Sequence, residues 1–298
     1  MVSEEIGRKE YMGYVTKPIR IDFPTDKPSE FYRNNPDINL ALRRIGYFLV
    51  DQGIDQLVEE YFEGIHDLNS VVSELSVLAF PKVGNLIIDR NDLDINWGDF
   101  RNVSVLLAIK KENGLSSDYL PLAFPAGKDL EQLINTMNEV IVGLSYQVKT
   151  EEDLNLLASF AKVCLVRIHP LQDGNGRLSR AFYRFVKKFV GYQNDIVFLD
   201  EKWPDIKSES DHSNSLYRQE NEIFNELQLL VQEKPRYKER DFTYPDGVKL
   251  IDIMYEDIKE GLTNGMRKFI KLDDLRKSKT LVDIANGKIM SQTKSPQT

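Results

Sequence analysis

The chain has 298 residues, of which 41% are hydrophobic and 29% charged, and its net charge is −8. These are the values of a globular protein long enough to bury a large core, and the acidic balance argues against nonspecific nucleic-acid binding. No apolar run reaches membrane-spanning length, the first residues do not form a signal peptide, and the single cysteine, Cys164, excludes an internal disulfide. We therefore expect a cytoplasmic protein that binds neither nucleic acid nor a membrane.

The hydrophobic pattern predicts a mainly helical chain with one small β element. Residues 1–35 form an extended, proline-broken arm in this interpretation, and helices are expected over 38–52 and 54–80. Strand-like segments follow at 103–109 and 119–124, joined by Lys110–Gly114 with its Asn-Gly turn signal. The sequence therefore predicts a β-hairpin inserted among helices.

Three helices are predicted after the hairpin. The first covers 130–148. The second follows an N-cap at Thr150 and is apolar on nearly every side over 154–168, which places it in the middle of a domain. The third covers 177–190 and is expected to stop before Gly191.

The C-terminal third is amphipathic and less informative. Residues 200–214 are polar and read as part of a linker, and helices are expected over 215–231, 248–262 and 267–284. The last eight residues form a frayed tail in this interpretation. The helices could pack on the core, form a dimer contact or hold a partner, and their spacing does not distinguish these options.

The stretch from His169 to Arg180 concentrates chemical function. Asp173–Gly176 favours a turn whose backbone N–H groups can converge on an anion, and this turn leads into a helix N-terminus, which favours phosphate. Arg177 and Arg180 share one face of the first turns. His169 ends the buried helix, so its position is rigid, as a general base requires.

Each of these residues also has an ordinary structural interpretation. A lone histidine is usually a satisfied structural group, Asp173 can simply close an Asx-turn, and the two arginines can be solvated charges. The later cations of the same helix, Arg184, Lys187 and Lys188, are interpreted as solvated surface charges.

The stretch resembles the signature of the Fic (Fido) family, His-Pro-Phe-x-Asp/Glu-Gly-Asn-Gly-Arg-x-x-Arg. The exception is Leu171, where the family usually has Phe; we expect this residue to be a core anchor. Upstream, Gly98–Arg101 is similar to the segment that opens the family's flap, and 124–134 to the helix start that closes it. The resemblance implies a mainly α fold, with a Fic-type helical bundle core, a small β-hairpin flap and helical N- and C-terminal extensions.

The sequence pattern and the resemblance together predict a domain organisation. The resemblance gives a core (55–191) with its flap at about 98–125, and the pattern gives an N-terminal arm and helix (1–54), a linker (192–214) and a C-terminal helical region with a frayed tail (215–298).

The activity that the resemblance implies is protein adenylyl transfer, the movement of AMP from ATP to a Ser, Thr or Tyr hydroxyl of a target protein, or of the protein itself. His169 would be the general base and Asp173 would hold Mg²⁺. The phosphates would be bound by Gly174, Asn175, Gly176, Arg177 and Arg180. The flap would position the target by strand addition through Tyr119, Leu120, Leu122 and Phe124.

Many members of the family carry an inhibitory Ser/Thr-x-x-x-Glu-Gly/Asn segment whose glutamate pairs with the second signature arginine. The match here is Ser70–Glu74, although Leu75 departs from the pattern. Glu74 is therefore a candidate inhibitor of Arg180. The competing interpretation is an exposed glutamate on an amphipathic helix.

Two alternative functions stay open. One is a Fic-fold enzyme that transfers another phosphate-containing group or removes AMP; the other is a non-catalytic nucleotide-binding regulator. The intact Asp-Gly-Asn-Gly-Arg run favours AMP transfer, because phosphate-transferring relatives tend to alter it. The target, the nucleotide preference, the role of residues 192–298 and the oligomeric state, including a homodimer, are not determined by the sequence.

Overall fold

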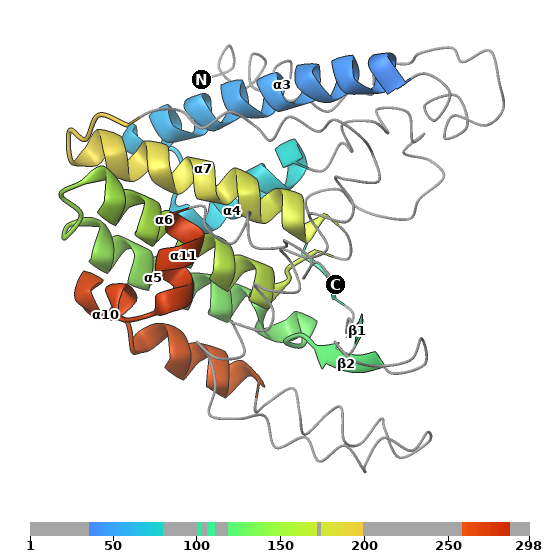
Figure 1. Cartoon of the computed structure of the whole chain (residues 1–298), viewed down its shortest axis with the longest axis vertical. Coiled ribbons are helices and arrows are strands. Elements are labelled where there is room, and N and C mark those ends of the chain that lie inside the picture. The colour runs from blue at the N-terminus through green and yellow to red at the C-terminus, as the bar shows by residue number, and fades with distance from the viewer. Residues whose placement is uncertain are drawn as a thin grey trace, which may run out of the picture. The chain divides into compact units, whose positions relative to one another are not determined.

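A computed structural model describes residues 36–79, 100–102, 106–110, 119–171, 174–198 and 258–286. These residues are mainly helical, which confirms the predicted fold class (Figure 1). They fall into two compact units, and each is described by itself: the first contains residues 36–79 and the second contains the others. The predicted N-terminal arm, the helix over 215–231 and the tail lie outside the described residues.

The first unit consists of helix α3 (Pro36–Phe62) and helix α4 (Leu68–Ala79), which pack against each other. The predicted break at Gly53 is wrong, because α3 continues through this residue. Gly53 faces Leu78 so closely that an added Cβ would lie 2.8 Å from its Cδ1 atom. The chain turns instead at Gly64, whose φ of 75° lies in the left-handed region.

Helix α6 (Glu151–Ile168) is the centre of the second unit (Figure 1). It packs against helix α5 (Leu130–Ser145) and helix α7 (Asn175–Gln193), and also against the C-terminal helices α10 (Leu272–Arg276) and α11 (Lys279–Ala285). Its side chains are buried over nearly the whole length, as its apolar sequence predicts. The predicted N-cap is confirmed, because the Thr150 side chain accepts a hydrogen bond from the Asp153 N–H at 3.2 Å.

The hairpin before α5 consists of β1 (Leu106–Lys110) and β2 (Tyr119–Ala123), which pair in antiparallel register. Lys110 pairs with Tyr119, so it belongs to the strand rather than to the turn, and the Asn-Gly turn signal lies outside the described residues. The 3-10 helix η2 (Gly127–Asp129) then leads into α5.

Helix α7 differs from its prediction in two ways. It continues to Gln193 instead of stopping before Gly191, because the missing side chain of that glycine leaves room for Phe198; an added Cβ would lie 2.8 Å from the Cδ1 atom of the ring. Lys187 and Lys188 are buried rather than solvated. The Lys187 ammonium lies 5.5 Å from the centroid of the Phe198 ring, a cation–π contact that favours this burial.

The described C-terminal residues are helical over 258–267, in α10 (Leu272–Arg276) and in α11 (Lys279–Ala285). The helix predicted over 267–284 is therefore interrupted, on both sides of α10. Both α10 and α11 pack on α6. The sequence left three roles open for the C-terminal helices, and α10 and α11 take the first of these by packing on the core.

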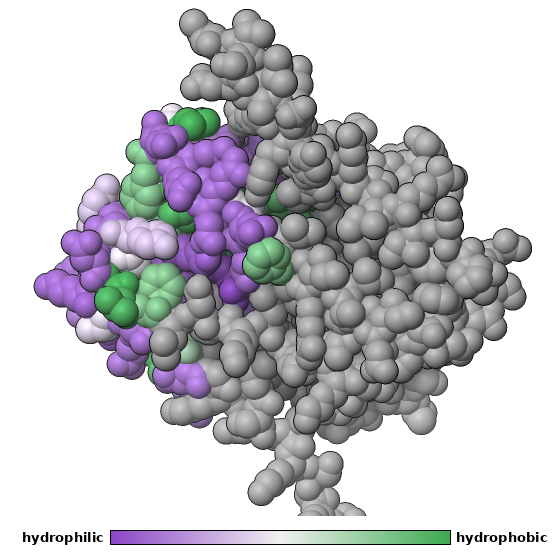
Figure 2. Space-filling model, turned by 90° about the horizontal axis from the view of Figure 1, so that it is seen from above, coloured by the Kyte–Doolittle hydropathy of each residue, from purple (hydrophilic) through white to green (hydrophobic). Residues whose placement is uncertain are grey.

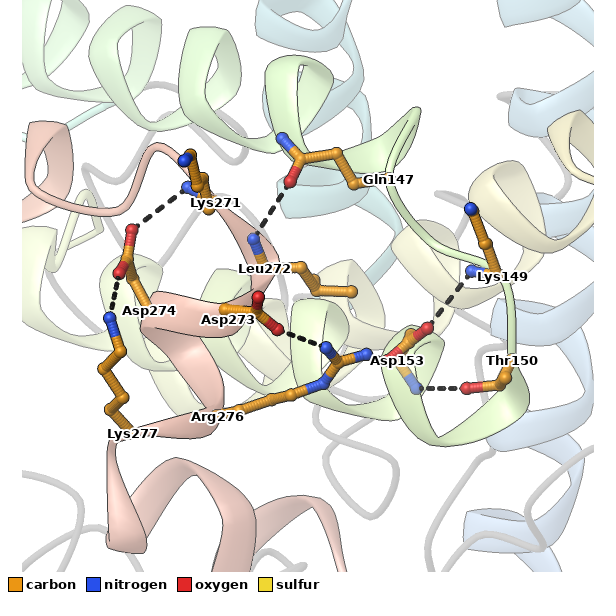
Figure 3. Close-up of polar contacts among 10 residues, drawn as sticks. All are labelled: Gln147, Lys149, Thr150, Asp153, Lys271, Leu272, Asp273, Asp274, Arg276 and Lys277. Carbon is orange, nitrogen blue, oxygen red and sulfur yellow. Dashed lines mark hydrogen bonds and ion pairs between the residues drawn. The ribbon is translucent and has the colours of Figure 1, made fainter.

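Side-chain contacts fasten α10 to the core (Figure 3). Gln147 accepts a hydrogen bond from the Leu272 N–H at 3.1 Å and donates one to the Ile270 carbonyl at the same distance. Arg276 pairs with Asp153 at 2.5 Å, and the second oxygen of that carboxylate accepts the Lys149 N–H. The start of α6 is thus bound to the C-terminal helices by both neutral and charged contacts.

None of the described helices is both long and apolar enough to cross a bilayer. On the face shown in Figure 2, the coloured residues are mainly hydrophilic, with apolar residues in small separate groups.

Candidate active site

His169 stands at the C-terminal end of α6 in a left-handed conformation, with φ 54° and ψ 58°. Its backbone N–H still donates to the Leu165 carbonyl at 3.0 Å, so the residue closes the helix while the chain turns away from it. A left-handed conformation is uncommon for a residue with a side chain and is typical of functional sites. The side chain is partly exposed. The imidazole is therefore held at the rim of a buried helix.

The neighbouring backbone sets the tautomer of this imidazole. Nδ1 lies 3.3 Å from the Val166 carbonyl oxygen, which can only accept a hydrogen bond. This contact favours the neutral tautomer with the hydrogen on Nδ1, in which the lone pair is on Nε2. The arrangement makes Nε2 the atom that can take up a proton.

Phe124 lies directly against the imidazole. The two rings are stacked, with centroids 3.8 Å apart and planes inclined by 18°. The Arg167 guanidinium lies 5.7 Å from the centroid of the same phenyl ring. The sequence placed Phe124 at the end of a flap strand and among the residues that position a target. It follows β2 and is fully buried against the imidazole, and its expected role in positioning a target stays a prediction.

Arg101 joins the segment before the hairpin to the histidine turn. It is 3% exposed, and its Nε donates to the His169 carbonyl at 2.7 Å while Nη2 donates to the Pro125 carbonyl at 2.5 Å. Its backbone N–H donates to the Pro170 carbonyl at 2.8 Å. The sequence analysis used Arg101 only as part of a flap motif and missed its place in the site. The similarity of Gly98–Arg101 to the family's flap opening was the available signal.

The loop after His169 is closed by a side chain. The Asn175 Oδ1 accepts the Leu171 N–H, and its Nδ2 donates to the Leu171 carbonyl, both at 2.8 Å. Asn175 is buried and shapes the turn; its expected role as a phosphate donor stays a prediction. The expected role of Leu171 as a core anchor is confirmed, since it is 3% exposed.

Helix α7 starts directly after this loop, with Gly174 as N-cap at a φ of 87°. The first N–H groups of an α-helix lack acceptors within the helix, and its dipole makes this end positive. Arg177 and Arg180, in the first two turns, are partly exposed and add two cations. The arrangement therefore favours a bound polyanion close to the turn that carries His169.

Some of the predicted site residues are placed only in part. Asp173 lies outside the described residues, so its role as a magnesium ligand stays a prediction. Within the ranges that the structure describes, no three His, Cys, Asp or Glu side chains group so that they could hold a metal ion. Tyr119, Leu120 and Leu122 lie in β2, where the structure describes the backbone but not the side chains. Glu74 lies on α4, in the other unit, and its pairing with Arg180 stays a prediction.

Cysteine chemistry has no place in this site. Cys164 is buried in α6, and burial raises the pKa of its thiol far above the ordinary value. A thiol in such surroundings is inert as a nucleophile. Of the groups considered so far, His169 is the one suited to proton transfer.

Comparison with known proteins agrees with this arrangement. Residues 80–186 match the model of the Fic/DOC family, and the match includes His169 and the first turns of α7. This part of the chain is similar to the Fic/DOC family, whose members are generally transferases.

A solved structure and the curated proteins add little to the family match. The chain is similar to a Fic domain containing signaling protein from Bacteroides thetaiotaomicron VPI-5482, with 15% identity over 95% of this chain and 92% of that one and a TM-score of 0.34. No curated protein matches the sequence. The family model, rather than this weak structural likeness, supports the assignment of the domain.

Proposed function

We propose that the protein is an adenylyltransferase that moves AMP from Mg-ATP to a Ser, Thr or Tyr hydroxyl of a target protein. One observation above all supports this proposal: His169 closes the buried helix α6, with Nδ1 3.3 Å from the Val166 carbonyl oxygen, a few residues before the N-terminus of α7. This combination provides a base and a polyanion site in one place. The family match makes group transfer the expected class of chemistry.

His169 acts as the general base in this proposal. Nε2 takes the proton of the target hydroxyl as its oxygen bonds to the α-phosphorus, and the bond between that phosphorus and the pyrophosphate oxygen breaks. The hydrogen bond from Nδ1 to Val166 keeps the ring in the tautomer that this step needs. The transfer is then largely a matter of positioning, which suits a residue fixed at the end of a buried helix.

Several described residues support the proposal that the phosphate chain of ATP binds at the start of α7. The N-terminus of α7 offers backbone donors, and Arg177 and Arg180 place positive charge where the leaving pyrophosphate gains negative charge. Gly174 and Gly176 leave room for close approach of phosphate to the backbone. Magnesium, with Asp173 as its predicted ligand, would share in neutralising this charge.

The hairpin is suited to binding a segment of the target protein. Among the described residues the sheet has two strands, so one backbone edge of each strand has no partner strand there and could pair with an extended chain. We propose that such a segment pairs with the flap, with Tyr119, Leu120 and Leu122 contributing contacts. The hydroxyl would then be held in line with the α-phosphate and within reach of His169.

The test is intact-mass spectrometry of the purified protein and of a lysate after incubation with Mg-ATP. The proposal expects a gain of the mass of AMP that depends on His169, so His169→Ala should abolish it while nucleotide affinity changes little. His66→Gln is the matched control, because His66 lies in the other unit, paired with Glu60 at 3.2 Å. A gain of phosphate alone, or tight ATP binding without covalent change, would overturn the proposal in favour of another transferase or a regulator.

A further inference from the structure

We propose that Phe124 is a positioning residue that fixes the His169 imidazole, and that Arg101 clamps the two chain segments that carry these rings. This inference deepens the proposed function, since it rests on His169 as the base. It assigns a role to two buried residues that lie outside the signature stretch. It also makes the orientation of the base depend on the flap, because Phe124 is the first residue after β2.

The stack restrains the plane of the imidazole ring. The imidazole is partly exposed, and its hydrogen bond to Val166 is long, at 3.3 Å. A fully buried phenyl ring covers one of its faces at a centroid distance of 3.8 Å. Rotation about χ1 would break both the stack and the hydrogen bond, whereas a half-turn about χ2 would keep the stack and lose the hydrogen bond to Val166. Phe124 therefore limits the orientations in which Nε2 can point.

Arg101 keeps the two rings together. Its guanidinium donates to the carbonyl of His169 itself and to the carbonyl of Pro125, the residue after Phe124. Its backbone N–H binds Pro170 on the other side of the histidine. One buried side chain thus ties together the backbone segments that carry the two rings.

The flap enters this arrangement through its last residue. Ala123 ends β2 and pairs with Leu106 of β1, and the next residue is Phe124. A displacement of the hairpin is therefore passed directly to the ring against the imidazole. We expect a target segment that pairs with the flap to stabilise the orientation in which the base is effective.

Phe124→Leu tests the stack, with Phe189→Leu as the matched control. Phe189 is 1% exposed and packs on Phe185 rather than on a histidine, so both substitutions remove a buried ring. Their effects on packing should be similar, but only one of them touches the imidazole. Phe124→Tyr restores the aromatic face and is the conservative rescue.

The first measurement is nuclear magnetic resonance of the histidine rings, which needs no enzymatic assay. The chain has three histidines, and His169→Gln identifies the signals of His169. In the wild type, the ring current of Phe124 should shift the His169 ring protons upfield. Phe124→Leu should remove this shift and allow His169 to populate both tautomers. Phe124→Tyr and Phe189→Leu should leave the shift and the tautomer population unchanged.

The second measurement is the rate of AMP transfer. Misplacing a base should lower kcat for Phe124→Leu by roughly tenfold to a hundredfold, with KM for ATP changed by no more than about twofold. Phe124→Tyr should recover most of kcat. A loss of packing alone would instead lower the activity of Phe189→Leu by the same factor.

Two results would overturn the inference: unchanged His169 resonances in folded Phe124→Leu, or equal changes in Phe124→Leu and Phe189→Leu. Should Phe124→Leu fail to fold, Phe124→Met fills more of the space of the ring and carries the same test. If the wild type transfers no AMP, the proposed function fails, but the resonance measurement still decides whether the stack fixes the imidazole.

Discussion

Two arginines fasten peripheral segments to the core, and they do so in different ways. Arg101, at the base of the flap, is 3% exposed and donates to backbone carbonyls around His169. The side chain of Arg276, on α10, is 51% exposed and pairs with the buried carboxylate of Asp153 (Figure 3). Water can replace the second contact but not the first, because carbonyls that lose a buried donor stay unsatisfied.

The comparison separates a contact that shapes the site from one that attaches an accessory element. We expect the flap base to behave as part of the catalytic core and the α10 contact to behave as a surface attachment. Cys164 offers one probe for both, because it is the sole cysteine and is buried in α6. Its alkylation requires opening of this helix bundle and so reports the stability of the second unit.

The largest effect is expected for Arg101→Met. The substitution keeps much of the buried volume but leaves the His169 and Pro125 carbonyls without their donor, at a cost of about 3 kcal/mol. In denaturant, Cys164 should be alkylated at a lower concentration than in the wild type. Arg101→Lys is the control, since it keeps the charge but cannot reach both carbonyls, and it should recover only part of the loss. Equal alkylation midpoints for the wild type, Arg101→Met and Arg101→Lys would refute the distinction between the Arg101 and Arg276 contacts.

A smaller effect is expected for Gly127→Ala at the exit of the flap. A Cβ at this position would lie 2.7 Å from the Arg101 carbonyl oxygen and 2.8 Å from the Cα of Asn102. Since both are backbone atoms, relief requires the two ends of the flap to move apart, at a cost of about 2 kcal/mol.

Gly143→Ala is the matched control for that substitution. Gly143 is exposed in α5, and a Cβ there would meet nothing within 4 Å. The change should stabilise the helix by about 0.5–1 kcal/mol. If the alkylation midpoint falls for Gly127→Ala and rises for Gly143→Ala, the loss of stability comes from the close contacts of Gly127 at the flap base and not from replacing a glycine as such. Shifts of the same sign would contradict the close approach of Gly127 to the Arg101 and Asn102 backbone.

The sequence predicted the helical frame better than it predicted the base of the flap. The cap at Thr150, the apolar α6 and the anchor Leu171 depend on local signals, namely capping chemistry and periodicity, and all three are confirmed. The roles of Arg101 and Phe124 depend on contacts with a turn some 45 to 70 residues later in the chain. No periodicity encodes such contacts.

Two glycines also show that contacts between distant residues cannot be predicted from local sequence signals. Gly53 and Gly191 were taken as helix ends, and both lie within helices because a side chain from elsewhere occupies the space beside them. Glycine marks a helix end only where the backbone needs a positive φ, as at Gly64. In the sequence, a glycine at a close packing contact looks the same as a glycine that ends a helix. Only the structure distinguishes these two roles.

For the second arginine contact, Arg276→Gln should cost much less stability than Arg101→Met, because a half-exposed ion pair is screened by water and salt. The loss should shrink as salt concentration rises, and Cys164 alkylation at low and high salt measures it. Lys277→Gln is the control: Lys277 is 74% exposed and pairs with Asp274, so its replacement should have no measurable effect. A loss for Arg276→Gln as large as that for Arg101→Met would mean that α10 belongs to the catalytic core.

The smallest effect concerns the first unit, where the Asp67 carboxylate accepts the Ser70 N–H at 2.7 Å at the start of α4. This hydrogen bond lowers the pKa of Asp67 below the ordinary value. A lowered pKa means that the cap stabilises α4 fully above the ordinary pKa of an aspartate and is lost as the pH falls through the lowered one. The Ser70 amide proton signal should therefore titrate with a midpoint below 3.8, and in Asp67→Asn it should not titrate. A midpoint at or above that value would show that the Ser70 N–H competes no better than water for the Asp67 carboxylate. This exposed hydrogen bond would then differ from the buried ones at the flap.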